Sequence, residues 1–482
     1  MSTGPIASGS FGRRPVIPII PAGAMYRAEK KIHPRSVKGW FASWRWLLVA
    51  LTQALFYGLP WLPWNGRQAV LFDLGARRFY LFGIVLYPQD FIYLTALLVI
   101  SAYALFLFTA VAGRLWCGYA CPQTVYTEIF LWVERRFEGD RAARMKRDAG
   151  RWTGDRLLRM AGKQAAWIAI ALWTGFSFVG YFTPIRTLAA EAVSLGFGPW
   201  EWFWVFFYGF ATYGNAGYMR EQVCKYMCPY ARFQGAMFDK DTMIISYDAG
   251  RGEPRGSRSK KADAAAIGLG ACVDCNLCVH VCPTGIDIRH GQQYECIGCA
   301  ACIDVCDDVM DRMNYPRGLV RYATENGLAQ HFDRAQMWRR VLRPRVLVYT
   351  SVLLLILGLF FGSLLTRAGY RVDVVRDRSA LAREVEDGQI ENVYRLQVMN
   401  ATEALQHYRV RATGLDGIVL LGATDVDVEP AQARWITVAV RVPHAVAGKA
   451  GAGAHPLEFI VDHGAGTEAD RLEEKSTFVV PR

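Results

Sequence analysis

Apolar residues along this chain are concentrated in long blocks, which predict membrane-spanning helices. A helix needs roughly 20 apolar residues to cross the hydrocarbon core of a bilayer. Blocks of about this length predict spans near residues 44–62, 91–113, 165–183, 200–219 and 346–365. The fourth block is rich in aromatic residues and contains three glycines, so a buried or re-entrant helix is the alternative there. We therefore expect a polytopic α-helical membrane protein with about five transmembrane helices.

The distribution of basic residues predicts how these helices are oriented. The formal net charge is +12, and basic residues are frequent in the N-terminal segment 1–43 and in the loop 114–164, which holds eleven Lys or Arg. The two short loops of the opposite side hold three and one. Positive residues mark cytoplasmic loops, so we expect the N-terminus and residues 220–345 in the cytoplasm. Outside these loops no basic stripe with interleaved aromatic residues occurs, and a nucleic-acid partner is not expected.

The pattern changes after the fifth span. Short runs of alternating apolar and polar residues, such as Tyr394–Val398 and Trp435–Val440, are separated by turn residues. Period-two alternation of this kind predicts a C-terminal Ig-like β-sandwich over residues 368–482. Five spans place it on the far side of the membrane. It has no cysteine, and we interpret it as an interaction domain.

Twelve cysteines lie between Cys117 and Cys306, an arrangement that favours metal ligands over a disulfide framework. The run C-x2-C-x2-C-x3-C occurs twice in a ferredoxin-like segment at about 267–312. In the bacterial two-cluster pattern the fourth cysteine of each run binds the other cluster, whereas structural zinc sites use compact four-ligand units. We therefore expect two 4Fe-4S clusters. Their predicted ligands are Cys272, Cys275, Cys278 and Cys306 for cluster 1, and Cys282, Cys296, Cys299 and Cys302 for cluster 2.

A second motif, CxxxCP, follows the second and the fourth apolar blocks of the four-helix membrane region, residues 44–219. Its cysteines are Cys117 and Cys121, then Cys224 and Cys228. Two identical motifs on one membrane side suggest an internal repeat that brings four thiols together. Cysteines four apart share one face of a helical turn. A copper site, for which soft sulfur selects Cu(I), a third cluster and a redox dithiol pair all remain open.

The order of parts resembles the FixG/CcoG family, also known as RdxA, of accessory proteins for the cbb-type haem-copper cytochrome oxidases of bacteria. The resemblance rests on the two CxxxCP motifs, the double cluster run, the last span and the β-rich tail. It implies a multi-pass protein of the bacterial inner membrane with a periplasmic C-terminal domain. It also implies a cupric reductase that supplies Cu(I) for oxidase assembly, with copper near the CxxxCP thiols. The implied partners are copper ions and oxidase assembly factors or copper chaperones.

Two other functions compete with copper reduction. The clusters are suited to relay electrons from quinol or a soluble donor to another redox enzyme, and the sandwich is suited to a structural assembly scaffold. The chain has no nucleotide or flavin signature such as a GxGxxG after a strand, so the sequence leaves the electron donor unidentified.

Overall fold

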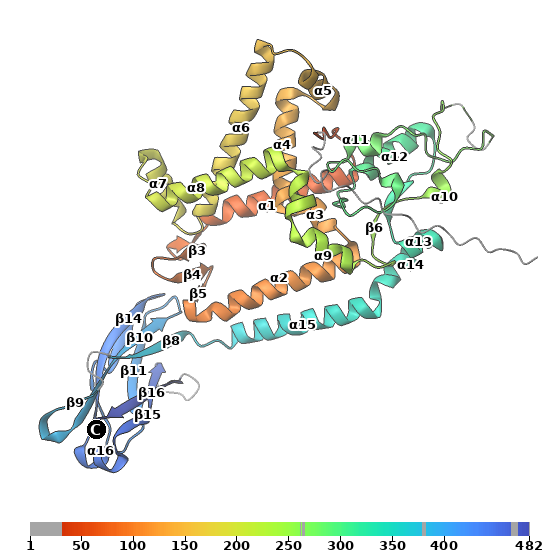
Figure 1. Ribbon diagram of the computed structural model, residues 1–482. Coiled ribbons are helices and arrows are strands. Elements are labelled where there is room, and N and C mark those ends of the chain that lie inside the picture. Colours follow the sequence, from red (N-terminus) through yellow and green to blue (C-terminus); the bar gives the residue numbers. More distant parts are fainter. Residues whose placement is uncertain (1–30, 261, 263–265, 378–381, 464–470, 482) are drawn as a thin grey trace, which may run out of the picture.

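The computed structural model describes residues 31–260, 262, 266–377, 382–463 and 471–481 (Figure 1). The basic N-terminal segment expected at 1–43 is therefore described only from Lys31 onward. Two long helices, α2 (Phe91–Ala112) and α15 (Pro344–Leu365), lie side by side. Figure 1 shows the β-sandwich at one end of this pair and the cysteine-rich region at the other.

Each of the five apolar blocks is helical. The other three contain α1 (Trp40–Gly58), α6 (Gly154–Val179) and α8 (Pro199–Thr212). Within the described residues, two helical stretches are long and apolar enough to cross a membrane, Pro88–Ala112 and Pro344–Leu365. Both have a mean hydropathy of 2.3 over the best window and are mostly unburied in the protein, as lipid-facing helices are. Their side chains are therefore free to contact lipid.

Helices α2 and α15 run antiparallel. The Tyr93 hydroxyl lies 3.0 Å from the Ser363 hydroxyl near one end, and the rings of Tyr103 and Tyr349 meet edge to face further along. In the fourth block, α8 continues directly into a π-helical stretch, Tyr213–Met219, so its glycines do not break the helix.

Helices α6 and α8 approach closely because both carry small residues at their crossing. A Cβ added at Gly175 of α6 would lie 2.2 Å from the carbonyl oxygen of Val205 in α8. Glycine permits this close backbone approach because it has no Cβ.

The C-terminal domain is an antiparallel β-sandwich. One sheet has the order β12 (Val419–Gly422), β14 (Ala433–Val442), β10 (Ile390–Asn400) and β8 (Tyr370–Arg376), and the short β9 (Arg383–Glu384) also pairs with β10. The other sheet has the order β13 (Asp425–Val428), β11 (Gln406–Thr413), β15 (Gly453–His463) and β16 (Arg471–Val480). Alternate residues of β10 and β14 point into one core, which confirms the Ig-like prediction.

A small three-stranded sheet connects this sandwich to the helices. Its strands are β3 (Val70–Asp73), β4 (Arg78–Leu81) and β5 (Ile84–Leu86). Residues Tyr80 and Val85 pack against Met399 of the sandwich. Nearby, the buried carboxylate of Asp90 accepts hydrogen bonds from Arg367 and Arg371. The sandwich is thus attached through packing and a buried ion pair, in addition to its covalent link to α15.

The cysteine-rich segment packs against the start of α1. It contains α11 (Leu277–Val281) and α12 (Ala301–Met313), beside the paired strands β6 (Ile244–Tyr247) and β7 (Val320–Ala323). The carboxylate of Asp304 accepts the backbone N–H groups of Phe41 and Ala42, which are free at the first turn of α1. This cap joins the cysteine-rich segment to α1.

Candidate functional site

The cysteines of the first predicted ligand set line one cavity. The first quartet, Cys272, Cys275, Cys278 and Cys306, lines a cavity of about 30 Å³. Apolar side chains from α11, α12 and β7 complete the walls. Cys275 is exposed, so this quartet reaches the protein surface. The sequence run and its distant fourth member, Cys306, thus lie together as the interlocked pattern requires.

The second predicted set lies deeper. The second quartet consists of Cys282, Cys296, Cys299 and Cys302. Burial, and then the proximity of the other three thiols, raises the pKa of Cys302. Cys299 is 7% exposed and its carbonyl oxygen accepts a hydrogen bond from Arg45 of α1 at 3.4 Å. This quartet therefore lies where the cysteine-rich segment contacts α1.

The four CxxxCP cysteines, Cys117, Cys121, Cys224 and Cys228, also lie together, and we call them the boundary quartet. Burial and the proximity of the other three raise the pKa of Cys224 to about 12. Burial also raises the pKa of Cys117 to about 11. Buried thiols stay protonated at neutral pH unless a cation stabilises the thiolate, so binding a metal here releases protons.

The prediction that both cysteines of a CxxxCP motif share one helical turn is wrong. Cys117 lies in the short helix α3 (Leu115–Tyr119), but Cys121 is extended and precedes α4 (Pro122–Glu138). Likewise Cys228 is extended between the π-helical stretch Val223–Met227 and α9 (Pro229–Met237). Proline disfavours helical geometry in the residue before it and favours the first position of a new helix.

The boundary quartet and the second quartet are in direct contact. A Cβ added at Gly118 would lie 2.8 Å from the Cα and N atoms of Cys299, and one added at Gly298 would lie 3.0 Å from the carbonyl of Arg114. The side chains of Cys117 and Cys224 pack against the apolar cluster that contains Cys299. The boundary quartet and the second quartet therefore meet at Gly118 and Gly298, where the backbones approach too closely for a residue with a Cβ.

A buried arginine and glutamine connect the two motifs with the second quartet. Arg114 is 6% exposed and donates to the carbonyl of Ala231 in α9 at 2.8 Å, to the carbonyl of Cys296 at 3.4 Å and to the side chain of Gln234. Gln234, which is fully buried, donates to the sulfur of Cys117 at 3.4 Å. Sequence analysis missed both residues. The position of Arg114, three residues before Cys117, was the one available signal.

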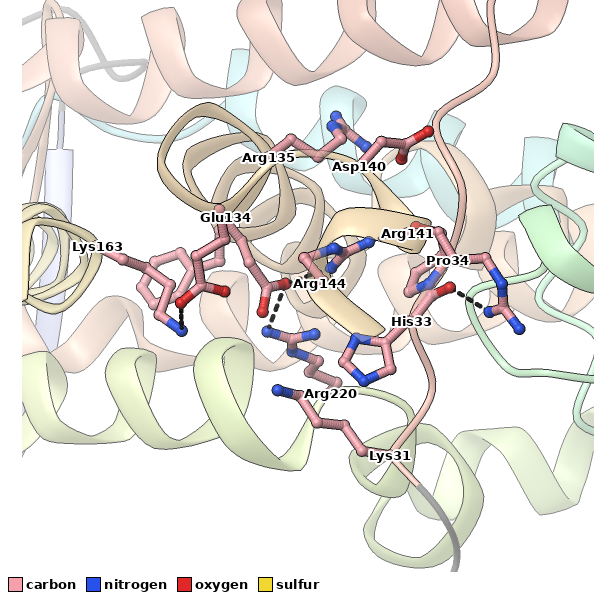
Figure 2. Close-up of polar contacts among 12 residues, drawn as sticks. Lys31, His33, Pro34, Glu134, Arg135, Asp140, Arg141, Arg144, Lys163 and Arg220 are labelled. Carbon is pink, nitrogen blue, oxygen red and sulfur yellow. Dashed lines mark hydrogen bonds and ion pairs between the residues drawn. The ribbon is translucent and has the colours of Figure 1, made fainter. Parts of the chain in front are cut away.

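A buried ion cluster joins α4 to Arg220, and Figure 2 shows its residues. One carboxylate oxygen of Glu134 in α4 contacts Arg144 at 2.7 Å and Arg220 at 3.1 Å. Gln123, next to the first motif, donates to the carbonyl of Arg220 at 3.0 Å, four residues before Cys224. Burial opposes ionisation of Glu134, but Arg220 and Arg144 outweigh it and lower its pKa. The charged carboxylate is therefore part of the fold.

Across the part of the chain that the structure describes, no three or more His, Cys, Asp or Glu side chains converge as a single metal ion requires. The three quartets consist of neighbouring thiols, whereas a 4Fe-4S cluster binds each cysteine to a different iron atom. The predicted site residues are the twelve cysteines, and each of them belongs to one of the three quartets.

Comparison with known proteins gives three family matches. A model described as a 4Fe-4S dicluster domain matches residues 219–325, and one described as a 4Fe-4S binding domain matches residues 94–139. A third, described as the Ig-like fold at the C-terminus of FixG, matches residues 360–481.

Several curated proteins are similar over most of the chain. The nitrogen fixation protein FixG of Rhizobium meliloti is 41% identical over 410 residues, which cover 78% of each protein. Protein RdxA of Cereibacter sphaeroides is 40% identical and covers 84% of this chain and 87% of its own. Protein RdxB of the same organism is 39% identical, with coverages of 81% and 83%. The crystal structure of a FixG-related protein from Vibrio parahaemolyticus aligns at 23% identity and a TM-score of 0.21, over 23% of this chain and 97% of that chain.

Proposed function

We propose that this chain, which belongs to the family of FixG, RdxA and RdxB, passes electrons to Cu(II). As a membrane-associated iron–sulfur oxidoreductase it would supply Cu(I) for the assembly of a cbb-type haem-copper oxidase. The observation that carries this proposal is the contact between Gly118 and Cys299. It makes the CxxxCP thiols neighbours of a predicted cluster. Soft sulfur ligands stabilise the reduced copper ion.

The two ferredoxin-type clusters have distinct positions in this proposal. Cluster 1 is held by the first quartet, whose cavity and apolar walls suit a cluster and whose Cys275 is exposed to a donor. Cluster 2 is held by the second quartet beside the boundary quartet. Thiolate ligands and surrounding apolar residues set the potential of such clusters, commonly in the low range. Electrons enter at cluster 1 and leave beyond cluster 2.

The reaction balances with one electron per copper ion. A reduced cluster gives one electron to Cu(II), which becomes Cu(I), and the cluster returns to its oxidised form. The soluble donor or quinol that reduces cluster 1 completes the cycle. The boundary quartet, where Cys117 and Cys224 adjoin Cys299, is the proposed exit of electrons to copper.

We further propose that five helices cross a bacterial inner membrane, with the clusters in the cytoplasm and the sandwich in the periplasm. The proposal is supported by the antiparallel α2 and α15, which have the cysteine-rich region at one end and the sandwich at the other (Figure 1). Helix α2 and the π-helical stretch after α8 end close to the boundary quartet. They lead into residues 114–164 and 220–345, which orientation rules assign to the cytoplasm. Protease added to intact spheroplasts is expected to digest the sandwich and spare the cluster segment.

Copper reduction is tested with the full chain purified anaerobically in detergent. Clusters are reduced, excess reductant is removed, and Cu(II) is added with a Cu(I)-specific chelator. Cluster absorbance and the Cu(I) complex are recorded together, because free thiols reduce copper without changing the cluster signal. The Cys117→Ala/Cys224→Ala variant is compared with wild type, and Gly235→Ala, which adds a Cβ with no atom within 4 Å, is the control.

We expect wild type and the control to reoxidise their clusters as Cu(I) appears, and the double variant to do so much more slowly. If no protein yields Cu(I) while a quinone or a redox partner reoxidises the clusters, the electron-relay alternative is correct. A scaffold predicts that deleting residues 368–482 abolishes oxidase assembly in cells, although copper reduction in vitro survives.

A further inference from the structure

The boundary quartet has the features of an iron–sulfur site. Cys121 is the N-cap residue of α4, at whose first turn the backbone N–H groups lack intrahelical partners. N–H groups at a helix start can donate to ligand sulfurs, and such hydrogen bonds are among the features that tune iron–sulfur clusters.

The two halves of the boundary quartet are built alike. In each, the first cysteine lies in a short helical segment and the second, extended, immediately precedes a proline that begins a new helix. The two new helices, α4 and α9, therefore both begin at the quartet, and helix N-termini favour negative charge. A 4Fe-4S cluster takes four cysteine ligands, which is the number of thiols in this quartet.

The family match to residues 94–139 is consistent with this. Its description is a 4Fe-4S binding domain, yet the matched segment contains only Cys117 and Cys121. A cluster held by cysteines alone takes four. Cys224 packs against the same apolar cluster as Cys117, and together with Cys228 it would complete the set of four.

Charge also distinguishes the candidate occupants. Four half-buried thiolates carry more negative charge than one Cu(I) offsets, whereas the iron core of a cluster brings several positive charges.

We propose that Cys117, Cys121, Cys224 and Cys228 together hold a third 4Fe-4S cluster, the last carrier of the relay. The inference rests on the proposed function, since it names the group that receives electrons from cluster 2. The third cluster accepts one electron from reduced cluster 2, which is thereby oxidised, and then gives that electron to Cu(II). No bond forms or breaks and no proton moves in either transfer.

The test counts clusters in the full chain, purified anaerobically and reconstituted with iron and sulfide. Iron, acid-labile sulfide and copper are measured per chain, and the spins of the dithionite-reduced protein are counted by EPR. Two variants are compared with wild type. Cys121→Ala/Cys228→Ala removes half of the boundary quartet. Cys275→Ala removes one ligand of cluster 1 and shows how much iron is lost when a ferredoxin-type site is damaged.

We expect about 12 iron atoms in wild type and about 8 in Cys121→Ala/Cys228→Ala, with the spectra of clusters 1 and 2 preserved in the variant. About 8 iron atoms in wild type, with both ferredoxin-type clusters fully counted by EPR, overturns the third cluster even if the variant does not fold. In that case one bound copper per chain assigns the quartet to copper instead.

Copper reduction is recorded separately, so the two proposals fail independently. A chain with about 8 iron atoms that still reduces Cu(II) retains the proposed function and loses the third cluster. A chain with about 12 iron atoms that leaves Cu(II) unreduced retains the third cluster and loses the copper acceptor.

Discussion

The contact between the boundary quartet and the second quartet is tested by Gly118→Ala. The new Cβ would lie 2.8 Å from two backbone atoms of Cys299, and ordinary van der Waals contact begins at 3.4 Å, so the loops must separate by about 0.6 Å (3.4 − 2.8). The opposing atoms are backbone and have no rotamer to change. Overpacking of this kind costs about 1–3 kcal/mol.

Two measurements on the reduced, detergent-purified protein follow this change. The first is the midpoint of thermal unfolding, which we expect to fall relative to wild type. The second is the rate at which Cu(II) reoxidises the clusters, which we expect to fall because electron tunnelling weakens with distance. The EPR signals of the ferredoxin-type clusters should keep their intensity, since no ligand is removed.

The matched control is Gly235→Ala in α9, where an added Cβ has no atom within 4 Å. In a helix interior this change is expected to stabilise by up to about 1 kcal/mol. The reasoning is refuted if Gly118→Ala and Gly235→Ala unfold at the same temperature and react with copper at the same rate. Loss of cluster signal in Gly118→Ala alone would show that the contact supports the second quartet itself.

Three further changes test the packing around the site. Glu134→Gln leaves two buried arginines without a counter-charge and should cost about 3 kcal/mol, measured by thermal unfolding, whereas Asp155→Asn in an exposed ion pair should cost under about 0.5 kcal/mol. Gly175→Ala should force α6 and α8 apart and lower the midpoint, while Gly358→Ala, with no atom near its new Cβ, should not; equal midpoints would contradict the close crossing. Asp90→Asn should release the sandwich from the helices and speed proteolysis of residues 366–369, and an unchanged digestion rate would show that apolar packing alone holds it.

Much of the fold could be predicted from patterns that are local in the sequence. Period-two alternation in β10 and β14 predicted the sandwich, and long apolar blocks predicted helices at α2 and α15. The cysteine spacing predicted which thiols lie together, because a ferredoxin run encodes its own turns. The same local logic failed where proline intervened, since Pro122 and Pro229 begin new helices and place the second cysteine of each motif outside the first.

The sequence by itself therefore determined which elements the protein contains: helices, a sandwich and three sets of thiols. Only the tertiary structure decided that Gly118 touches Cys299, that Gln234 donates to Cys117, and that Glu134 ties the first motif to Arg220. These partners are separated by between 86 and 181 residues, and no spacing rule reaches that far. The physical reason is that local patterns fix backbone geometry, whereas contacts between distant segments depend on how whole helices pack and on which buried charges must be paired.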